Sequence, residues 1–273
     1  MGYKIIASDL DKTLLGADQR VSKENWKAIE DLCEKGVHFV PASGRTYREM
    51  PTELLESPLI RYYITSNGTM VYDKVANKTY GLLMSRALGH YVLDTVYSYP
   101  TCLMVHADNR SYVEEKTHNP RDYAAFNMND YWITFAMDKE TAVPNLKEFA
   151  YGLPGIQAVI PFFQNKEDLK ACKALLEKDP RLTVAQSDPH ELEIFASEAG
   201  KGNALLLLAD LLHIDRADTI AVGDSINDCS MVDAAGLGLA MDNAMPELKA
   251  VADQVICHYT QHSAQYILEH FID

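Results

Sequence analysis

Short apolar runs alternate with a longer amphipathic stretch in the first part of the chain. The runs Tyr3–Ser8, Val37–Ala42 and Tyr62–Thr65 have the length and continuous apolar character of buried strands. Between the first two, helical spacing predicts a helix over Ser22–Lys35, with Ser22 as its N-cap and Gly36 just beyond its end. This strand–helix–strand order predicts a parallel, doubly wound sheet.

The same rhythm returns near the C-terminus. The pattern predicts helices over Gly202–Leu212 and Ser230–Ala235, and strands over Thr219–Val222 and Leu237–Met241. These segments would complete the sheet that the N-terminal part begins. The expected fold class is therefore α/β, with a Rossmann-like doubly wound parallel sheet.

The middle of the chain has a different pattern. Strand-like runs occur at Cys102–His106, Trp132–Met137 and Arg181–Ala185, and a helix is expected over Lys166–Lys178. We interpret this part as an α+β domain inserted into a discontinuous core. The core would comprise residues 1–83 and 190–273, and the inserted domain residues 84–189.

The composition narrows the classes of partner. Apolar residues make up 47% of the 273 residues, which suffices for a sizeable core and for two domains. The formal net charge of −14 gives no general attraction for nucleic acid or an anionic membrane, so we expect neither as a partner. A phosphate-bearing ligand would need local positive charge, a metal or backbone N–H groups.

The cysteines and the apolar stretches bear on the compartment. The five cysteines form no C-x-x-C pair, which favours neither a zinc site nor a disulfide framework and suits a reducing cytosol. The first residues show no secretory signal, and no apolar stretch is long enough to span a bilayer. We therefore expect a cytoplasmic protein.

The strongest chemical signal is Asp9-Leu10-Asp11-Lys12-Thr13, directly after the first expected strand. Open α/β sheets place their sites at such strand ends. One aspartate can act as nucleophile and metal ligand, while the other moves a proton to a leaving oxygen and from an attacking water. A calcium-binding EF-hand loop also opens with D-x-D, but it needs Glu at its twelfth position, where Arg20 stands.

Three further motifs suit an anionic ligand. Ser43-Gly44-Arg45 offers a hydroxyl and backbone N–H groups after the second strand. Ser66-Asn67-Gly68 follows the third strand, and Lys201 opens a helix at the end whose dipole disfavours a cation. Taken singly, these motifs are more commonly a helix cap, a plain turn and a solvated lysine. Their combination is what indicates a site.

A second acidic cluster follows the expected strand Thr219–Val222, in Gly223-Asp224-Ser225-Ile226-Asn227-Asp228. Carboxylate and amide oxygens suit Mg²⁺, which takes few carboxylates and keeps several waters. Helix capping by Asp224 or Ser225 is the alternative. We expect a magnesium site here.

The order of these motifs resembles a known family. D-x-D-x-T, S-G-R, S-N-G, a downstream K-G and G-D-x-x-N-D together resemble the haloacid dehalogenase superfamily. More narrowly, they resemble its Cof-like phosphatase branch, which carries a large α/β cap domain after the third core strand. The run Ala235–Ala244 also resembles the segment that follows the G-D-x-x-N-D motif in this branch. The resemblance covers the core from Tyr3 to about Cys257, whereas the cap matches only in size and position.

The resemblance implies a role for each matching residue. Asp9 would be the nucleophile and Asp11 the general acid and base. Magnesium would be bound by Asp9, the backbone carbonyl of Asp11, Asp224, and Asp228 directly or through water. The remaining residues would bind phosphate or substrate: the backbone at Leu10, Ser43, Gly44, Arg45, Asn67, Lys201 and Asn227.

The chain departs from the family pattern at three places. Lys12 replaces the usual glycine, and it would be strained if the position required a positive φ; we expect its side chain toward solvent or the substrate opening. Ser43 replaces the commoner threonine and keeps the hydroxyl. Tyr259–Ala264 lacks the usual Asp-Gly-Val stretch, which puts substrate contacts from there in doubt.

The resemblance implies a magnesium-dependent phosphatase that hydrolyses small phosphorylated metabolites, such as sugar phosphates, through a phospho-aspartate. A phosphomutase or phosphotransferase on the same scaffold is one alternative. A non-catalytic phospho-acceptor regulatory module is another, which the large inserted domain disfavours. Specificity should come from the cap, where His106, Asp108, Asn109 and His118 are candidate contacts, although packing or surface placement is commoner for such residues. The sequence does not predict the oligomeric state.

Overall fold

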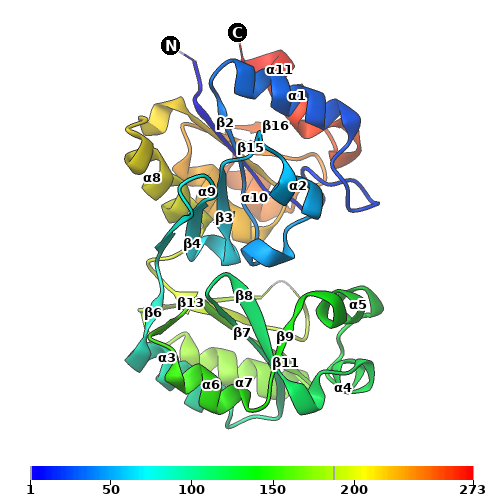
Figure 1. Ribbon diagram of the computed structural model, residues 1–273, viewed down its shortest axis with the longest axis vertical. Coiled ribbons are helices and arrows are strands. Elements are labelled where there is room, and N and C mark those ends of the chain that lie inside the picture. The colour runs from blue at the N-terminus through cyan, green and yellow to red at the C-terminus, as the bar shows by residue number, and fades with distance from the viewer. Residues whose placement is uncertain (1, 187, 273) are drawn as a thin grey trace. The chain divides into compact units, whose positions relative to one another are not determined.

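The computed structural model describes residues 2–186 and 188–272, and these form two compact units (Figure 1). The core unit contains the chain up to Arg45, Met50–Tyr80, and the chain from Gly200 onward. The cap unit contains Thr46–Glu49 and Gly81–Ala199. Residues 190–199, which the sequence pattern placed in the core, thus lie in the cap, because a strand at Glu193–Ala196 pairs within the cap sheet.

A five-stranded sheet forms the centre of the core unit, in the order β16-β15-β14-β1-β2. All neighbouring strands are parallel. β1 and β14 are fully buried, as a parallel sheet covered on both faces requires. The expected doubly wound parallel sheet is therefore confirmed. The strands are β1 (Ile5–Ser8), β2 (His38–Pro41), β14 (Thr219–Gly223), β15 (Leu237–Ala240) and β16 (Gln254–Val255).

Two groups of helices flank this sheet. In the first group α1 (Lys23–Glu34) packs on α11 (Ser263–Phe271). The second group contains α8 (Lys201–Leu212), α9 (Cys229–Ala234) and α10 (Pro246–Val251). A short helix, α2 (Thr52–Glu56), precedes β3. Right-handed crossovers place the two groups on opposite faces.

Helix α1 begins and ends where its sequence predicts. The N–H of Asn25 donates to Ser22 Oγ at 3.1 Å, which satisfies one free donor of the first turn. Gly36, just after the helix, has a φ of +81°, a conformation that glycine adopts without strain.

The third expected strand is present but does not join the main sheet. β3 (Tyr62–Thr65) pairs antiparallel with β4 (Met70–Asp73), and β5 (Lys78–Gly81) completes a three-stranded sheet. A parallel bridge between Ala42 and Ile64 connects β3 to the chain after β2. The 3-10 turn η2 (Ser66–Gly68) reverses the chain directly after β3, so that β4 becomes its nearest partner.

The cap unit is built on a six-stranded sheet with the order β12-β13-β11-β7-β8-β9. Helices α3, α6 and α7 pack together on one face, where Tyr112 of β8 contacts Phe149 of α6 with ring centroids 4.4 Å apart. No helix in the described part of the chain is long and apolar enough to cross a membrane. The cap helices are α3 (Arg86–Val96), α4 (Pro120–Ala125), α5 (Asp130–Lys139), α6 (Leu146–Gly152) and α7 (Lys166–Leu176). Its strands are β6 (Met84–Ser85), β7 (Thr101–Ala107), β8 (Arg110–Glu114), β9 (Thr141–Val143), β10 (Gly155–Ile156), β11 (Ala158–Phe163), β12 (Leu182–Ala185) and β13 (Glu193–Ala196).

One expected strand of the cap is a helix. Trp132–Met137 lies within α5, because Asn129 caps this segment: the N–H of Trp132 donates to Asn129 Oδ1 at 3.0 Å. Ile133 and Ala136 are buried and the residues between them are not, which is helical spacing. The aromatic residues of this run favoured a strand, and the N-terminal cap decided otherwise.

Candidate active site

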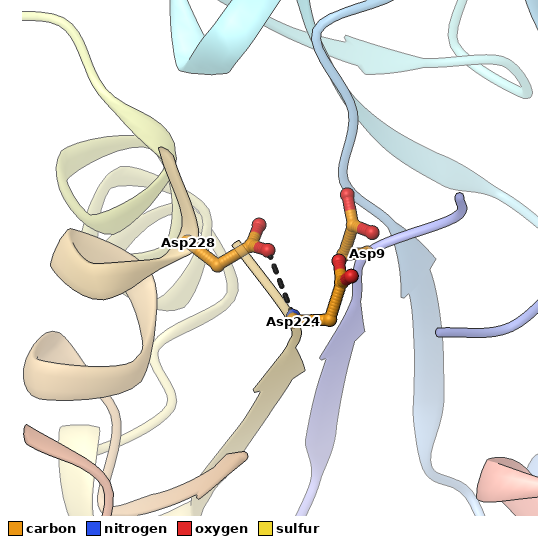
Figure 2. Close-up of side chains that lie close together, drawn as sticks. All are labelled: Asp9, Asp224 and Asp228. Carbon is orange, nitrogen blue, oxygen red and sulfur yellow. Dashed lines mark hydrogen bonds between the residues drawn. The ribbon is translucent and has the colours of Figure 1, made fainter. Parts of the chain in front are cut away.

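Three aspartates meet at the carboxyl ends of β1 and β14. Asp9 directly follows β1, Asp224 directly follows β14, and Asp228 ends the 3-10 turn η5 (Ile226–Asp228). One carboxylate oxygen from each lies within 4.8 Å of the other two (Figure 2). The register explains the meeting, because Ser8 pairs with Val222 across the adjacent strands. The structure thus brings together three of the four residues expected to bind a metal.

Asp228 is held in place by the loop that precedes it. Its Oδ2 accepts the N–H groups of Asp224 and Ser225, each at 3.1 Å; Figure 2 shows the first of these bonds. A Cβ at Gly223 would lie 2.5 Å from the Cβ of Asp228, so this turn requires glycine. The second oxygen of Asp228 remains available for Lys201.

Lys201 bridges two of the aspartates. Its Nζ donates to Asp9 Oδ1 at 2.7 Å and to Asp228 Oδ1 at 2.6 Å, and its side chain is 0% exposed. The start of α8 is fixed by a close backbone contact, since a Cβ at Gly68 would lie 2.2 Å from the carbonyl carbon of Gly200. The third motif therefore positions the lysine.

The electrostatics of this cluster favour an added cation. Burial raises the pKa of Asp9, and the charge of Asp228 raises it further, although Lys201 opposes both. Burial, followed by the charge of Asp228, raises the pKa of Asp224 to about 7. Burial alone would lower the pKa of Lys201, but the two carboxylates outweigh it and raise that pKa. One ammonium facing three buried carboxylates leaves negative charge uncompensated, so this donor set fits a divalent cation.

Asp11 lies outside this cluster and is paired with Arg45. Arg45 Nη2 donates to Asp11 Oδ1 at 2.7 Å, and Nε donates to Oδ2 at 3.2 Å. The same Nη2 donates to Gln19 Oε1 at 2.9 Å. The sequence predicted Arg45 as a substrate-binding residue, and the structure places it on the expected general acid. Gln19 was missed, because its distance from any motif gave no signal.

The second, third and fifth motifs converge through Asn67. Asn227 Nδ2 donates to Asn67 Oδ1 at 3.0 Å, and a Cβ at Gly44 would lie 3.2 Å from the same oxygen. Asn67 has a φ of +53°, a left-handed conformation that Asn tolerates better than most residues. Ser43 Oγ accepts the N–H of Arg45 at 3.2 Å, which leaves its hydroxyl hydrogen for another acceptor.

Lys12 stands where the family usually has glycine, and the backbone there has a positive φ. Its φ is +60°, so the lysine adopts a strained backbone conformation. The side chain is exposed, and its charge lowers the pKa of Asp224. Asn243, which the sequence did not single out, donates from Nδ2 to the Lys12 carbonyl at 3.0 Å and lies 3.5 Å from Asp224 Oδ2. Leu10 is buried, and its carbonyl accepts the N–H groups of Thr13, Leu14 and Leu15.

The fold and the site define a hydrolase of the haloacid dehalogenase type, and comparison with known proteins agrees. The family model described as haloacid dehalogenase-like hydrolase matches residues 6–268, so the chain belongs to this family. The chain is 27% identical to the phosphatase YwpJ of Bacillus subtilis, over 98% of this chain and all of that protein. It is 29% identical to the 5-amino-6-(5-phospho-D-ribitylamino)uracil phosphatase YwtE of the same organism, over 98% of both chains.

A solved structure supports the same assignment. The structure of a haloacid dehalogenase-like hydrolase from B. subtilis superposes with a TM-score of 0.81 and 27% sequence identity, covering 98% of this chain and 99% of that one. The similarity therefore includes the cap as well as the core.

Proposed function

We propose that this protein is a magnesium-dependent phosphatase that hydrolyses small phosphorylated metabolites, such as sugar phosphates, through a phospho-aspartate on Asp9. The contact of Lys201 with Asp9 and Asp228, beside Asp224, carries the proposal. The Asp9 carboxylate and an anionic phosphate ester would normally repel each other. The ammonium of Lys201 and a bound metal ion would neutralise charge on the phosphoryl oxygens, so that Asp9 can approach the ester. The phosphatase names of the relatives support a small phosphorylated substrate.

The proposed reaction uses two aspartates in turn. An oxygen of Asp9 attacks phosphorus and forms a P–O bond, while the ester P–O bond breaks and Asp11 gives a proton to the leaving oxygen. Asp11 then takes a proton from water, whose oxygen attacks phosphorus, so that inorganic phosphate leaves and Asp9 is regenerated.

The other residues would bind the phosphoryl group or hold the reacting groups. Mg²⁺ would be bound by Asp9, Asp224, Asp228 and the backbone carbonyl of Asp11, and when bound it neutralises charge on the phosphoryl oxygens. The phosphoryl-binding residues would be the backbone at Leu10, Ser43, Gly44, Lys201 and Asn227. Arg45 and Asn67 would bind phosphate or substrate as well, and their contacts support a second role for each, in which Arg45 orients Asp11 and Asn67 orients Asn227.

Two alternatives share part of this chemistry. A phosphomutase would form the same phospho-aspartate but return the phosphoryl group to a sugar hydroxyl instead of to water. A phospho-acceptor regulatory module would be phosphorylated on Asp9 without turnover. Release of inorganic phosphate, measured over many turnovers, distinguishes both from a phosphatase.

The decisive experiment compares the wild-type protein with Asp9→Asn on an aryl phosphate and a panel of phosphorylated metabolites. The amide is a very poor nucleophile, so phosphate release should fall by about 10⁴-fold or more, and no hydroxylamine-sensitive phosphoprotein should form. Asp18→Asn changes an exposed aspartate of the same loop and should retain activity. Turnover in Asp9→Asn near the wild-type rate, or full activity in excess EDTA, would overturn the proposal.

A further inference from the structure

The loop that carries Asp9 and Asp11, residues 9–15, is held in place by side chains from outside it. We call it the aspartate loop. Three consecutive backbone carbonyls of this loop each accept a hydrogen bond from a side chain of a different part of the core unit. These bonds are Asn243 Nδ2 to Lys12 at 3.0 Å, Ser263 Oγ to Thr13 at 2.8 Å, and Asn25 Nδ2 to Leu14 at 3.1 Å.

Two of these side chains also contact the chain around the start of helix α11. Asn243 Oδ1 accepts the N–H of Tyr259 at 3.0 Å, and Asn25 Oδ1 accepts the N–H of Ala264 at 3.0 Å. Ser263 is itself the first residue of α11. A carbonyl only accepts and an N–H only donates, so a side-chain amide can satisfy one of each at the same time. All three side chains therefore connect the aspartate loop to the C-terminal part of the chain.

A tight turn presents this part of the chain, residues 259–264, to the loop. We call it the C-terminal segment. His262 has a φ of +62°, a left-handed conformation, directly before α11. Its Nδ1 lies 2.9 Å from the hydroxyl of Ser22, the N-cap of α1, so the turn is attached to the helix that carries Asn25. Ser263 and Asn25 are 1% and 2% exposed, so water is excluded from their bonds and the loss of either donor would leave a buried carbonyl without its partner.

The aspartate loop needs this support because its backbone is strained. Lys12 has a φ of +60°, and such a conformation persists only where the surrounding structure fixes it. Inside the loop, the Leu10 carbonyl accepts the N–H groups of three residues that follow it, which fixes the shape of the turn. Its place relative to the rest of the site depends on outside contacts. Asn243 provides one, because Nδ2 also lies 3.5 Å from Asp224 Oδ2.

We propose that Asn25, Asn243 and Ser263 are positioning residues, and that with the C-terminal segment they hold the aspartate loop in the geometry that phosphoryl transfer requires. This inference rests on the proposed function, because it takes Asp9 and Asp11 as the reacting groups. The three residues act through the loop backbone rather than on the substrate. Their loss should therefore lower kcat and leave KM nearly unchanged.

The first test removes a single hydroxyl. Ser263→Ala deletes the donor to the Thr13 carbonyl, and we expect kcat for phosphate release from an aryl phosphate to fall about 5- to 30-fold, with KM within about twofold of the wild type. Ser263→Thr keeps the hydroxyl and should recover most of the activity. The matched control is Thr260→Ala, which removes an exposed hydroxyl of the same segment, 2.9 Å from His258 Nδ1, and should retain wild-type kcat.

The second test removes an amide and then both groups. Asn243→Ala leaves the Lys12 carbonyl and the Tyr259 N–H without their shared partner and should lower kcat by a similar factor. Gln254→Ala, at an exposed amide on β16, is its control. The double variant Ser263→Ala/Asn243→Ala should lose less than the product of the two single effects, because the first loss already frees the loop that both groups hold. A loss equal to that product would overturn the shared role.

Hydrogen exchange of the full chain, measured by mass spectrometry, separates failure of this inference from failure of the proposed function, because it needs no turnover. Peptides that cover the aspartate loop should exchange faster in Ser263→Ala and Asn243→Ala but not in the two control variants, while peptides from β14 keep wild-type exchange. Faster exchange confined to the loop, in a protein that releases no phosphate, would overturn the phosphatase but support the positioning contacts. An active phosphatase whose Ser263→Ala and Asn243→Ala variants keep wild-type kcat would overturn the inference alone. Loss of protection in β14 as well would show general destabilisation, which would overturn it too.

Discussion

The guanidinium of Arg45 donates to both oxygens of the Asp11 carboxylate, at 2.7 and 3.2 Å. A two-point contact fixes the plane of a carboxylate, which a single ammonium does not do. The proton that Asp11 is proposed to transfer therefore leaves from, and returns to, an oriented group. Gln19, which accepts from the same guanidinium, orients Arg45 in turn.

Replacing this fork should slow proton transfer more than substrate binding. In Arg45→Lys we expect kcat to fall by about 10- to 100-fold with a smaller change in KM, because a lysine contacts one oxygen only and leaves Asp11 free to rotate. Arg20→Lys, at an exposed arginine of the loop that carries Asp11, is the control. A pure KM effect would instead make Arg45 a substrate ligand.

Removing the buried ammonium should destabilise the metal-free protein. Lys201→Met keeps the volume but leaves Asp9 and Asp228 without their shared cation, which typically costs about 3–5 kcal/mol for a buried pair. Adding Asp228→Asn removes one of the repelling charges and should restore part of the loss. Urea unfolding curves of the two variants measure both effects. Equal stability of Lys201→Met and the wild type would show that the ammonium does not stabilise this cluster.

Stability of the metal-free protein should fall as the pH rises from about 4 to 7. The folded protein holds a proton on Asp224 up to a pKa of about 7, against an ordinary value of 3.8, so the unfolded chain releases this proton first. The contribution of Asp224 to the free energy of unfolding is fully present below its pKa of 3.8 in the unfolded chain. It is lost by up to about 1.4 kcal/mol per pH unit as the pH rises toward the folded-state pKa of about 7. Asp9 adds to the same trend.

Magnesium should reverse this trend, because it replaces the protons on the aspartates. We expect the increase in Tm on adding excess Mg²⁺ to be larger at pH 8 than at pH 6. Asp224→Asn should remove most of this difference, whereas Asp18→Asn should keep it. A Tm increase independent of pH would mean that the metal binds away from Asp224.

Lys12→Gly should leave the stability of the fold nearly unchanged and tighten metal binding. Glycine relieves the strain of a φ of +60°, worth about 1 kcal/mol, against a comparable entropic cost of glycine in the unfolded chain. Loss of the positive charge beside Asp224 should lower the Kd for Mg²⁺ about two- to threefold at pH 8.5, where Asp224 is ionised. Isothermal titration measures the affinity, and Lys12→Arg, which keeps the charge, should bind as the wild type does.

Strand and helix positions in the core were predictable because their signals are local. Ser22 marks the start of α1 and Gly36 its end, and buried apolar runs mark β1 and β14. The partner of a strand is a non-local property. Nothing within Tyr62–Thr65 shows that the turn at Ser66–Gly68 will direct it to β4 rather than to the main sheet.

In the site, too, the residues were predictable from the sequence but their side-chain contacts were not. Its motif residues were identified from chemistry and spacing, and strand register brings Asp9 and Asp224 together. The pairing of Arg45 with Asp11, and of Asn67 with Asn227, depends on side-chain directions that the sequence does not encode locally. Trp132–Met137 failed for a related reason, since an asparagine cap outside the run decided its structure.

The central strand β1 acquires its two neighbours at very different times during synthesis. β2 leaves the ribosome soon after it, but β14 follows only after the whole cap, and at about 5–20 residues per second this delay is roughly 10–40 s. Until then one edge of β1 is an unpaired apolar strand, the kind of surface that chaperones bind and that aggregates in their absence. Asp9 is translated early, whereas Lys201 and Asp224 are translated near the end of synthesis. A nascent chain therefore cannot hydrolyse phosphate esters before nearly all of it has been translated.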